Sequence, residues 1–112
     1  MKQIFGLGIA LLSSLGYLPA YGAAQLFTCT PYGVGENVDR IFIHCANPQP
    51  GPILYYAVST ADHDRAARVL ALATGAILAG HAIDIVYDSN DISGTLYGCS
   101  DDCRPILFVE LK

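Results

Sequence analysis

The stretch from Ser59 to His81 is a single long helical pattern set among short strand-like runs. Ser59, Thr60 and Asp62 are candidate N-caps, because a short side-chain oxygen can accept a hydrogen bond from the free backbone N–H groups of the first helical turn. Gly80 is the natural C-terminal stop, since glycine adopts a left-handed backbone conformation without a steric penalty. The sequence therefore predicts one long helix with strands on both sides of it.

One side of this helix is predicted to face a core, and the opposite side is small and polar. The core-facing set is Ala66, Val69, Leu70, Ala73 and Ile77, and the opposite set is Asp64, Arg68, Ala71 and Gly75. Leu72 and Leu78 flank the core-facing stripe and belong to neither set. A helix this apolar is usually buried on more than one side. We therefore expect the two leucines to lie at a subunit interface or to be covered by loops of the same chain.

The first 24 residues have the features of a secretory signal peptide. Lys2 precedes an apolar run from Ile4 to Leu18, and small residues surround a cleavage point after Gly22 or Ala24. The run is too short and too early to favour a membrane span. We expect an exported chain, periplasmic or secreted and not inserted in a membrane, whose mature part (residues 25–112) is a single domain.

The charge balance excludes two classes of partner. Six Lys and Arg residues against ten Asp and Glu residues give a formal charge of −4, and removing Lys2 leaves five against ten, or −5. An acidic chain without a basic cluster is not expected to bind nucleic acid or anionic membranes.

Four cysteines lie in the mature part, and an even count in a small exported chain predicts disulfides. Three pairings are possible. Cys29 and Cys45 lie in strand-like runs and could face each other across a hairpin, whereas Cys99 and Cys103 enclose only three residues. We predict the disulfides Cys29–Cys45 and Cys99–Cys103. Because the cysteines lack the paired short spacings of zinc modules, we expect no metal site.

Five strand-like runs surround the helix, covering residues 25–30, 39–46, 53–59, 82–87 and 105–111. Residues 31–37 and 88–104 are predicted as loops because turn-forming residues interrupt any periodicity, and the prolines of Asn47–Pro52 indicate a stiff connector. Three strands, a helix and two strands is the order of an OB-type barrel, in which the helix plugs one open end. The expected fold class is α+β and mostly β: a small five-stranded OB-type barrel with one helix between strands 3 and 4.

The sequence carries little that indicates catalysis. It has no Gly-x-Ser-x-Gly or His-Glu-x-x-His motif, and no cysteine is free if both disulfides form. The three histidines, His44, His63 and His81, are scattered over a predicted strand and the two helix ends. We therefore predict that the protein is not an enzyme and needs no cofactor.

OB-folds bind ligands on strands 2 and 3 and in the loops after strands 1 and 4. In this chain the two loops carry Tyr32, Glu36, Asn37, Asp91, Thr95 and Tyr97. Aromatic rings can stack on sugar faces while carboxylates and amides bind hydroxyls, so these six residues are candidates for binding carbohydrate. Tyrosines also cover the rim of small cores with their hydroxyl in water, which is the purely structural explanation. Arg40, His44 and Tyr55 are further candidates on the strand faces.

Several stretches together resemble a known family. They are Leu26–Cys29, Ile41–Ala46, the helix and Gly98–Cys103. This arrangement is similar to the B subunits of subtilase-cytotoxin and related pertussis-like AB5 toxins. The resemblance implies an OB-fold with two such disulfides, a pentamer whose helices surround a central pore, and binding of sialylated glycans on host cells. The chain departs from the family in its short segment before Cys29 and in the closer spacing of its second cysteine pair, so the family's glycan contacts do not transfer residue by residue.

The sequence as a whole predicts an exported, non-catalytic binding module of the AB5 toxin B-subunit type. We expect it to recognise cell-surface glycans as an oligomer, with a homopentamer implied by the resemblance. The alternative is a monomeric periplasmic or secreted module on the same fold that binds another protein, as an inhibitor or assembly factor. In that alternative, Leu72 and Leu78 are covered within one chain.

Overall fold

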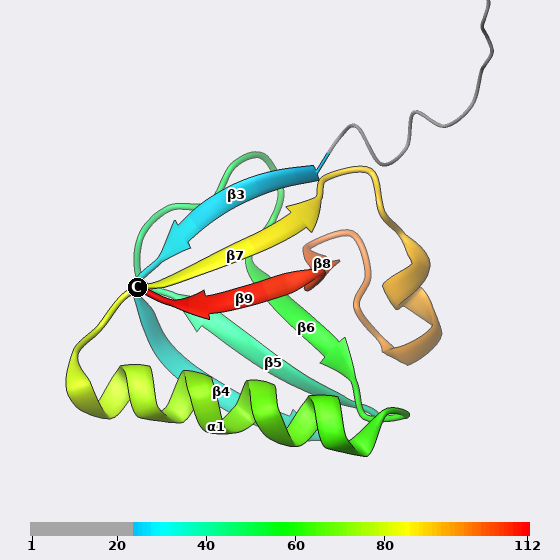
Figure 1. Cartoon of the computed structure of the whole chain (residues 1–112). Coiled ribbons are helices and arrows are strands. Elements are labelled where there is room, and N and C mark those ends of the chain that lie inside the picture. Colours follow the sequence, from blue (N-terminus) through cyan, green and yellow to red (C-terminus); the bar gives the residue numbers. More distant parts are fainter. Residues whose placement is uncertain (1–23) are drawn as a thin grey trace, which may run out of the picture.

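The computed structural model describes residues 24–112, so the predicted signal peptide, apart from Ala24, lies outside the described residues. Within this range, seven strands, one α-helix and one 3₁₀ helix follow one another (Figure 1). Their order is β3 (Ala24–Cys29), β4 (Pro31–Asn37), β5 (Arg40–Cys45), β6 (Tyr55–Ser59), α1 (His63–Ala79), β7 (Ile83–Asp88), η2 (Ser93–Tyr97), β8 (Cys103–Pro105) and β9 (Phe108–Leu111). The prediction of a small, mostly β domain with one long helix is confirmed.

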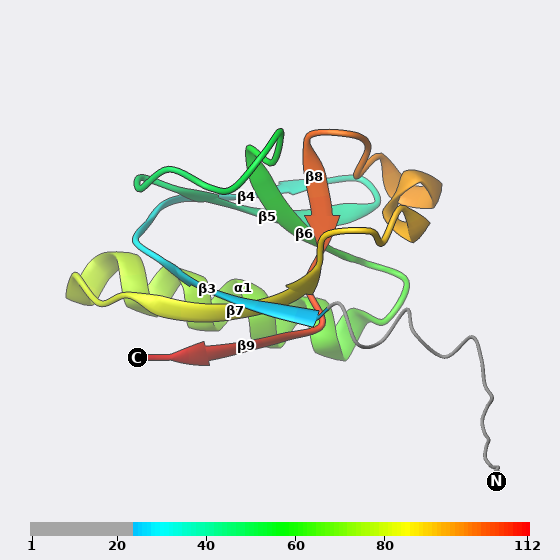
Figure 2. The ribbon, with the colours of Figure 1, turned by 90° about the horizontal axis from the view of Figure 1, so that it is seen from above.

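The strands form two sheets. One has the order β3-β7-β9 and is antiparallel throughout, and the other has the order β4-β5-β6-β8, in which β8 runs parallel to β6. The chain crosses directly from one sheet to the other at Thr30, between β3 and β4, and at residues 106–107, between β8 and β9. It also crosses between β6 and β7, through α1, and between β7 and β8, through η2. Figure 2 shows the two sheets as separate layers. The paired strands of residues 24–112 are thus arranged in two sheets and not in one continuous barrel.

The main core lies between the two sheets and α1. Its largest fully buried side chains are those of Tyr56, Tyr87, Ile43, Ile83, Ile85 and Val58. They come from β5, β6 and β7, where every second residue points inward, as the two-residue period of a strand requires. Helix α1 lies below both sheets in the view of Figure 1 and packs mainly against β4, β5 and β9, of which β4 and β9 are outer strands.

Helix α1 begins and ends where its capping residues predict. The Asp62 side chain accepts a hydrogen bond from the backbone N–H of Arg65, and Gly80 adopts a left-handed conformation with φ of 72°. The buried positions are Ala66, Val69, Ala73 and Ala76. The assignment of Leu70 to the core was wrong, because its side chain is 36% exposed. Small alanines occupy the inner side instead, since they let the helix approach the sheets closely.

Two predictions about the strands were also wrong. Residues 31–37 were expected to form a loop but form β4, which pairs with β5 after an irregularity between Pro31 and Gly33. Proline and glycine are tolerated there because β4 is the outer strand of its sheet. The last predicted strand, residues 105–111, contains β9 only in its second half, whereas β8 begins inside the predicted loop 88–104 and belongs to the other sheet.

The structure joins Cys29 to Cys45 and Cys99 to Cys103, and none of the cysteines in the described part of the chain is free. The first disulfide connects the end of β3 to the end of β5 and therefore links the two sheets. No helix within residues 24–112 is long and apolar enough to cross a membrane.

Candidate functional site

The outer face of the four-stranded sheet carries a group of aromatic side chains. On β5, Ile41, Ile43 and Cys45 are buried in the main core, so the alternate residues Arg40, Phe42 and His44 lie on the opposite face. Neighbouring strands add one ring each, Tyr32 from β4 and Tyr55 from β6. We call Tyr32, Phe42, His44 and Tyr55 the aromatic face.

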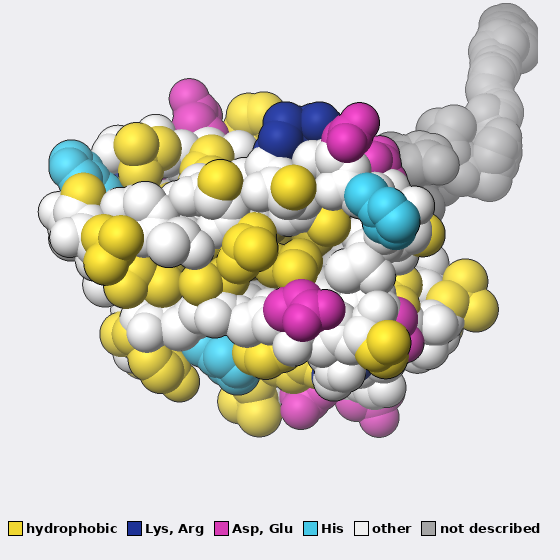
Figure 3. All heavy atoms as spheres, turned by 90° about the horizontal axis from the view of Figure 1, so that it is seen from below, with side chains coloured by type: hydrophobic (Ala, Val, Ile, Leu, Met, Phe, Trp, Pro, Cys, Tyr) yellow, Lys and Arg dark blue, Asp and Glu magenta, His cyan; other side chains and the backbone are white. Residues whose placement is uncertain are grey.

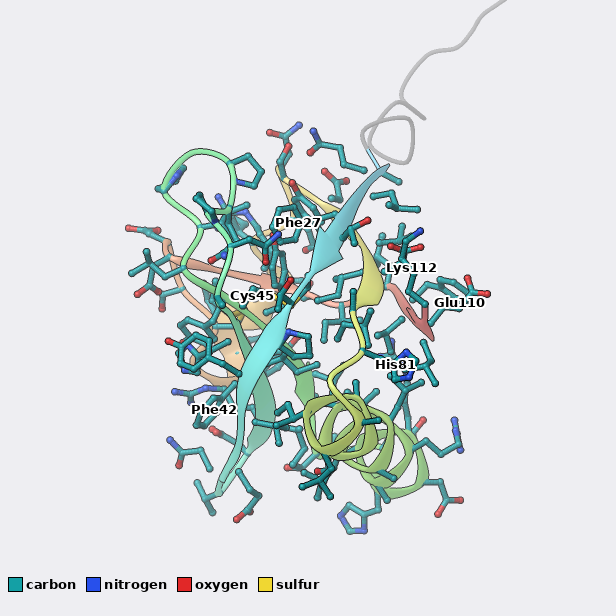
Figure 4. The ribbon with its side chains drawn as sticks, turned by 90° about the vertical axis from the view of Figure 1, so that its left-hand side faces the viewer. Phe27, Phe42, Cys45, His81, Glu110 and Lys112 are labelled. Carbon is teal, nitrogen blue, oxygen red and sulfur yellow. A yellow bond between two sulfur atoms is a disulfide. The ribbon has the colours of Figure 1, made fainter. Side chains whose placement is uncertain are left out.

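His44 lies at the centre of the aromatic face and pairs with each of the other three rings. The centroid of the His44 ring lies 5.9 Å from that of Tyr32, 5.3 Å from that of Phe42 and 5.3 Å from that of Tyr55. The rings of Phe42 and Tyr55 are 6.1 Å apart in an edge-on arrangement. These separations are typical of stabilising aromatic pairs. Figure 4 places Phe42 on the opposite side of the molecule from Glu110 and Lys112, so the aromatic face is remote from the outer face of β9.

The Phe42 ring lies over Gly35, which has no side chain to block it. A Cβ atom at Gly35 would lie 2.7 Å from Cε1 of Phe42, so the ring covers this glycine on the neighbouring strand. A Cβ atom at Gly33 would contact only His44, at 3.8 Å, which is an ordinary van der Waals distance. Gly35, one of the two glycines that obscured β4 in the sequence, thus leaves room for the Phe42 ring of the neighbouring strand.

A hollow of about 540 Å³ adjoins the aromatic face at Tyr32 and His44, a size usual for small-ligand sites. Its other wall is the connector between β5 and β6, from Ala46 to Leu54. Asn47 fixes this connector, because its amide donates to the carbonyl of Thr28 at 2.8 Å and its oxygen accepts from the N–H of Thr30 at 2.9 Å. One wall of the hollow is therefore hydrogen-bonded to Thr28 and Thr30, where the chain passes from β3 to β4.

The other end of the outer face is organised by Arg40. Its Nη1 donates to the carbonyl oxygen of Tyr97 at 3.2 Å and lies 3.5 Å from the Asp39 carboxylate. Burial, and next the nearby Asp91 carboxylate, raise the pKa of the Tyr97 hydroxyl. A second hollow, of about 550 Å³, lies beside Tyr97. It is lined by Asp39, Ser59, Thr60, Ala61, His63, Leu96 and Tyr97.

The six ligand-binding candidates from the sequence are spread over the molecule. Tyr32 lies at one end of the outer face and Tyr97 borders the second hollow at the other end. Glu36 and Asn37 are exposed at the end of β4, where the Asn37 side chain accepts a hydrogen bond from the N–H of Val38.

The remaining two candidates lie in the segment between β7 and β8. Asp91 accepts from the N–H of Ser93 at 2.8 Å, as in a local turn, and Thr95 is exposed in η2.

The structure brings Tyr32 together with His44 and Tyr55, which the sequence offered only as further candidates on the strand faces. Phe42 was not predicted as a site residue. The signal that could have found it is the alternation on β5, because Phe42 lies between Arg40 and His44 in the outward-facing row.

The chemistry of the outer face suits binding by stacking. Within residues 24–112, no group of three or more His, Cys, Asp or Glu side chains is placed to hold a metal ion. The histidines are also separated: His44 belongs to the aromatic face, His63 lines the second hollow, and His81 is exposed after α1. Rings, phenol hydroxyls and one imidazole make a surface that offers both apolar contact and hydrogen bonds to a bound molecule.

Comparisons with known proteins define the class of fold. No family model and no curated protein matches the sequence. Among solved structures, the chain is similar to the cholera toxin-like B-subunit from Citrobacter freundii, with a TM-score of 0.52 and 17% sequence identity. The match covers 82% of this chain and 87% of that chain. The chain therefore has the fold of a toxin B subunit, and the resemblance inferred from the sequence is confirmed at that level.

Proposed function

We propose that this protein is an exported, non-catalytic binding module that recognises carbohydrate through the aromatic face. The observation that carries the proposal is the cluster of four touching rings on the solvent side of the four-stranded sheet. The fold supports it, since the similar solved structure is a cholera toxin-like B-subunit. The two disulfides fit export to the periplasm or the cell exterior, where disulfides persist.

The aromatic face has the properties that a sugar ring requires. Tyr32 is 64% exposed, and we propose that its ring stacks on the C–H side of a sugar. The phenol hydroxyls of Tyr32 and Tyr55 and the imidazole of His44 can exchange hydrogen bonds with sugar hydroxyls. The adjoining hollow at the β5–β6 connector is large enough for one sugar unit, so we place the terminal residue of the glycan there.

We infer that the two sheets together represent the OB-type arrangement expected from the sequence. If β3 and β4 are taken as one strand bent at Thr30, and β8 and β9 as one strand broken at residues 106–107, five strands remain and α1 lies between the third and fourth. Each of the two interrupted strands belongs to both sheets, which supports a barrel flattened into two layers.

We also propose that the protein acts as an oligomer, with a pentamer of the subtilase- or pertussis-like type as the specific form. Leu78 on α1 is 83% exposed, and Figure 3, which looks onto the α1 side, shows hydrophobic side chains gathered in a band. Among the described strands, β3 and β9 are the outer strands of the three-stranded sheet and carry the exposed Leu26 and Phe108. Apolar edges of this kind are usually covered in stable proteins.

One observation favours the alternative function, a monomer that binds another protein. Leu72 packs against the main core of its own chain, as the monomeric interpretation expects, whereas Leu78 does not. Native mass spectrometry of the oxidised protein separates the two. A pentamer supports the toxin-like assembly, and a monomer leaves only the protein-binding or single-site interpretation.

The test of carbohydrate binding is a printed array of sialylated and non-sialylated mammalian glycans, probed with the oxidised protein. We expect binding that is lost in His44→Ala and in Tyr32→Ala and kept in His81→Ala. His81 is the matched control because it is an exposed histidine at the end of α1. Absence of binding to every glycan, or equal loss in His81→Ala, would remove the basis of the proposal.

A further inference from the structure

The two faces of the four-stranded sheet contribute to two separate apolar clusters. The larger is the main core. The smaller consists of Ala57, Cys99 and Cys103, with Phe42, Tyr55 and Tyr97 packed against it. Strand β6 takes part in both, because Tyr56 and Val58 belong to the main core and Ala57, between them, to the smaller cluster. The Cys99–Cys103 disulfide therefore belongs to the cluster against which two rings of the aromatic face pack.

The residues around this disulfide pack against it and against the sheet. We call residues 93–105, which comprise η2, the disulfide turn and β8, the cystine segment. Gly94 is buried in η2, and a Cβ atom there would lie 2.7 Å from the Cβ of Cys99 and 3.1 Å from its Sγ. Gly98, with φ of 87°, lies against the Arg40 guanidinium, whose Nη1 donates to the Tyr97 carbonyl. η2 is thus packed closely against the disulfide at Gly94 and against Arg40 at Gly98.

The other end of the disulfide is fixed to the strand that carries Tyr55. The carbonyl of Asp102 accepts hydrogen bonds from the N–H groups of Leu54, at 2.7 Å, and Tyr55, at 3.3 Å. Strand β8 then pairs with β6, and the N–H of Ile106 donates to the carbonyl of Ala57 at 2.9 Å. The disulfide is thus held between η2 on one side and the backbone of β6 on the other.

From these contacts we propose that the Cys99–Cys103 disulfide is a positioning group for the aromatic face. Its two cysteines and Ala57 are the buried members of the cluster against which Phe42, Tyr55 and Tyr97 pack. The main core does not need it, since Cys29 and Cys45 are the cysteines that belong to that core. The two disulfides therefore have different tasks: one holds the two sheets together, and the other sets the geometry of the binding surface.

The experiment compares the oxidised wild-type protein with the double variant Cys99→Ala, Cys103→Ala. Alanine is used because both cysteines are buried. Ser100→Ala is the matched control, since it changes an exposed residue inside the same turn and keeps the disulfide. Amide hydrogen exchange and aromatic NMR shifts are recorded for all three proteins, and each is probed on the glycan array.

In the double variant we expect amide exchange in residues 93–106 to accelerate at least tenfold, with the amides of β5 and β7 unchanged. The ring signals of Phe42, Tyr55 and Tyr97 should move, while those of Tyr56 and Tyr87 stay. The affinity for the best glycan of the array should fall at least tenfold. Ser100→Ala should match the wild type in every measurement.

Two results would overturn the proposal. One is unchanged exchange in the cystine segment, and the other is equal acceleration in β5 and β7, which would make the disulfide a support of the whole fold. The binding measurement rests on the proposed function, but the exchange measurement does not. If no glycan binds the wild type, carbohydrate recognition fails and exchange still decides the positioning role. If the double variant binds as tightly as the wild type, the positioning role fails and carbohydrate recognition stands.

Discussion

The substitution Gly94→Ala tests how tightly η2 rests on the second disulfide. The added Cβ would meet Cys99 Cβ at 2.7 Å, Cys99 Sγ at 3.1 Å and Pro105 Cγ at 3.1 Å. None of these atoms is the tip of a flexible side chain, because two belong to a disulfide and one to a proline ring. The neighbours must therefore move, or η2 must lift away from the sheet.

The size of the effect follows from two opposing terms. Inserting a methyl group into a well-packed site costs about 1–3 kcal/mol, and replacing glycine by alanine stabilises by about 0.4–1 kcal/mol through the unfolded chain. The net loss in the free energy of unfolding is then about 0–2.6 kcal/mol, with a central value of about 1.3 kcal/mol. For a domain of this size, each kcal/mol corresponds to a fall in Tm of roughly 4–8 °C.

Gly75→Ala is the matched control for this prediction. A Cβ at Gly75 meets nothing within 4 Å, and the residue lies inside α1 without a positive φ. Alanine should therefore stabilise the helix by about 0.5–1 kcal/mol. Thermal unfolding followed by circular dichroism measures both variants. If Gly94→Ala melts at or above the wild-type temperature, the packing of η2 on the disulfide is not as tight as we infer.

Four further predictions concern the main core and the surface. The free energy of unfolding of the double variant Cys29→Ala, Cys45→Ala, measured with urea, should be lower by about 3 kcal/mol, the chain-entropy value for a loop of this length. An unchanged urea midpoint would contradict this prediction. The Tyr56 hydroxyl is buried without a hydrogen-bond partner in the described part of the chain. Tyr56→Phe should therefore leave the free energy of unfolding unchanged or raise it by up to about 1 kcal/mol. A fall in the free energy of unfolding by more than about 1 kcal/mol would show that the hydroxyl does form a hydrogen bond. Burial, with a smaller effect of Tyr87, raises the pKa of Tyr56, so the unfolded chain loses this proton first. Stability should therefore fall as pH rises above about 10, at up to about 1.4 kcal/mol per pH unit for this group, and a pH titration in which Tyr56→Phe keeps the full slope would exclude it as the cause. Leu78→Glu should change stability by less than about 0.5 kcal/mol if the side chain faces water. The same substitution should dissociate an oligomer whose interface lies on α1. If analytical ultracentrifugation shows the same assembly for the wild type and for Leu78→Glu, the interface lies elsewhere.

The helix could be predicted from the sequence to within a few residues because its ends are marked by local chemistry. Asp62 and Gly80 act as caps within one turn of the residues they bind, so no distant part of the chain is needed to see them. The inner side of the helix was less predictable. Whether Leu70 or Ala76 is buried depends on how closely the sheets approach the helix, and the hydrophobic periodicity of the sequence does not predict that distance.

Strand β4 was missed because the residues that hid it have a long-range purpose. Gly33 and Gly35 interrupt a strand pattern when they are considered alone. In the fold, Gly35 makes room for the ring of Phe42 on the neighbouring strand. The break between β8 and β9 was also not predictable from local sequence. It marks where the chain passes from one sheet to the other at residues 106–107, and this passage is defined only by the tertiary structure.

The candidate site was predicted in part for the same reason. Loop composition drew attention to Tyr32 and Tyr97, which do border hollows on the outer face. It could not show that Tyr32 contacts His44, since they lie on different strands and meet only through the register of β4 with β5. Alternation along β5 was the part of the sequence that indicated this face most directly.

The measurement that tests carbohydrate recognition most directly is aromatic NMR of the oxidised protein during titration with the glycan that binds best on the array. We predict that the signals of Tyr32, Phe42, His44 and Tyr55 shift together and saturate with one affinity, and that the Tyr87 ring in the main core does not shift. Shifts confined to the outer face of β3, β7 and β9, or rings of the aromatic face that remain unchanged at saturation, would contradict the account.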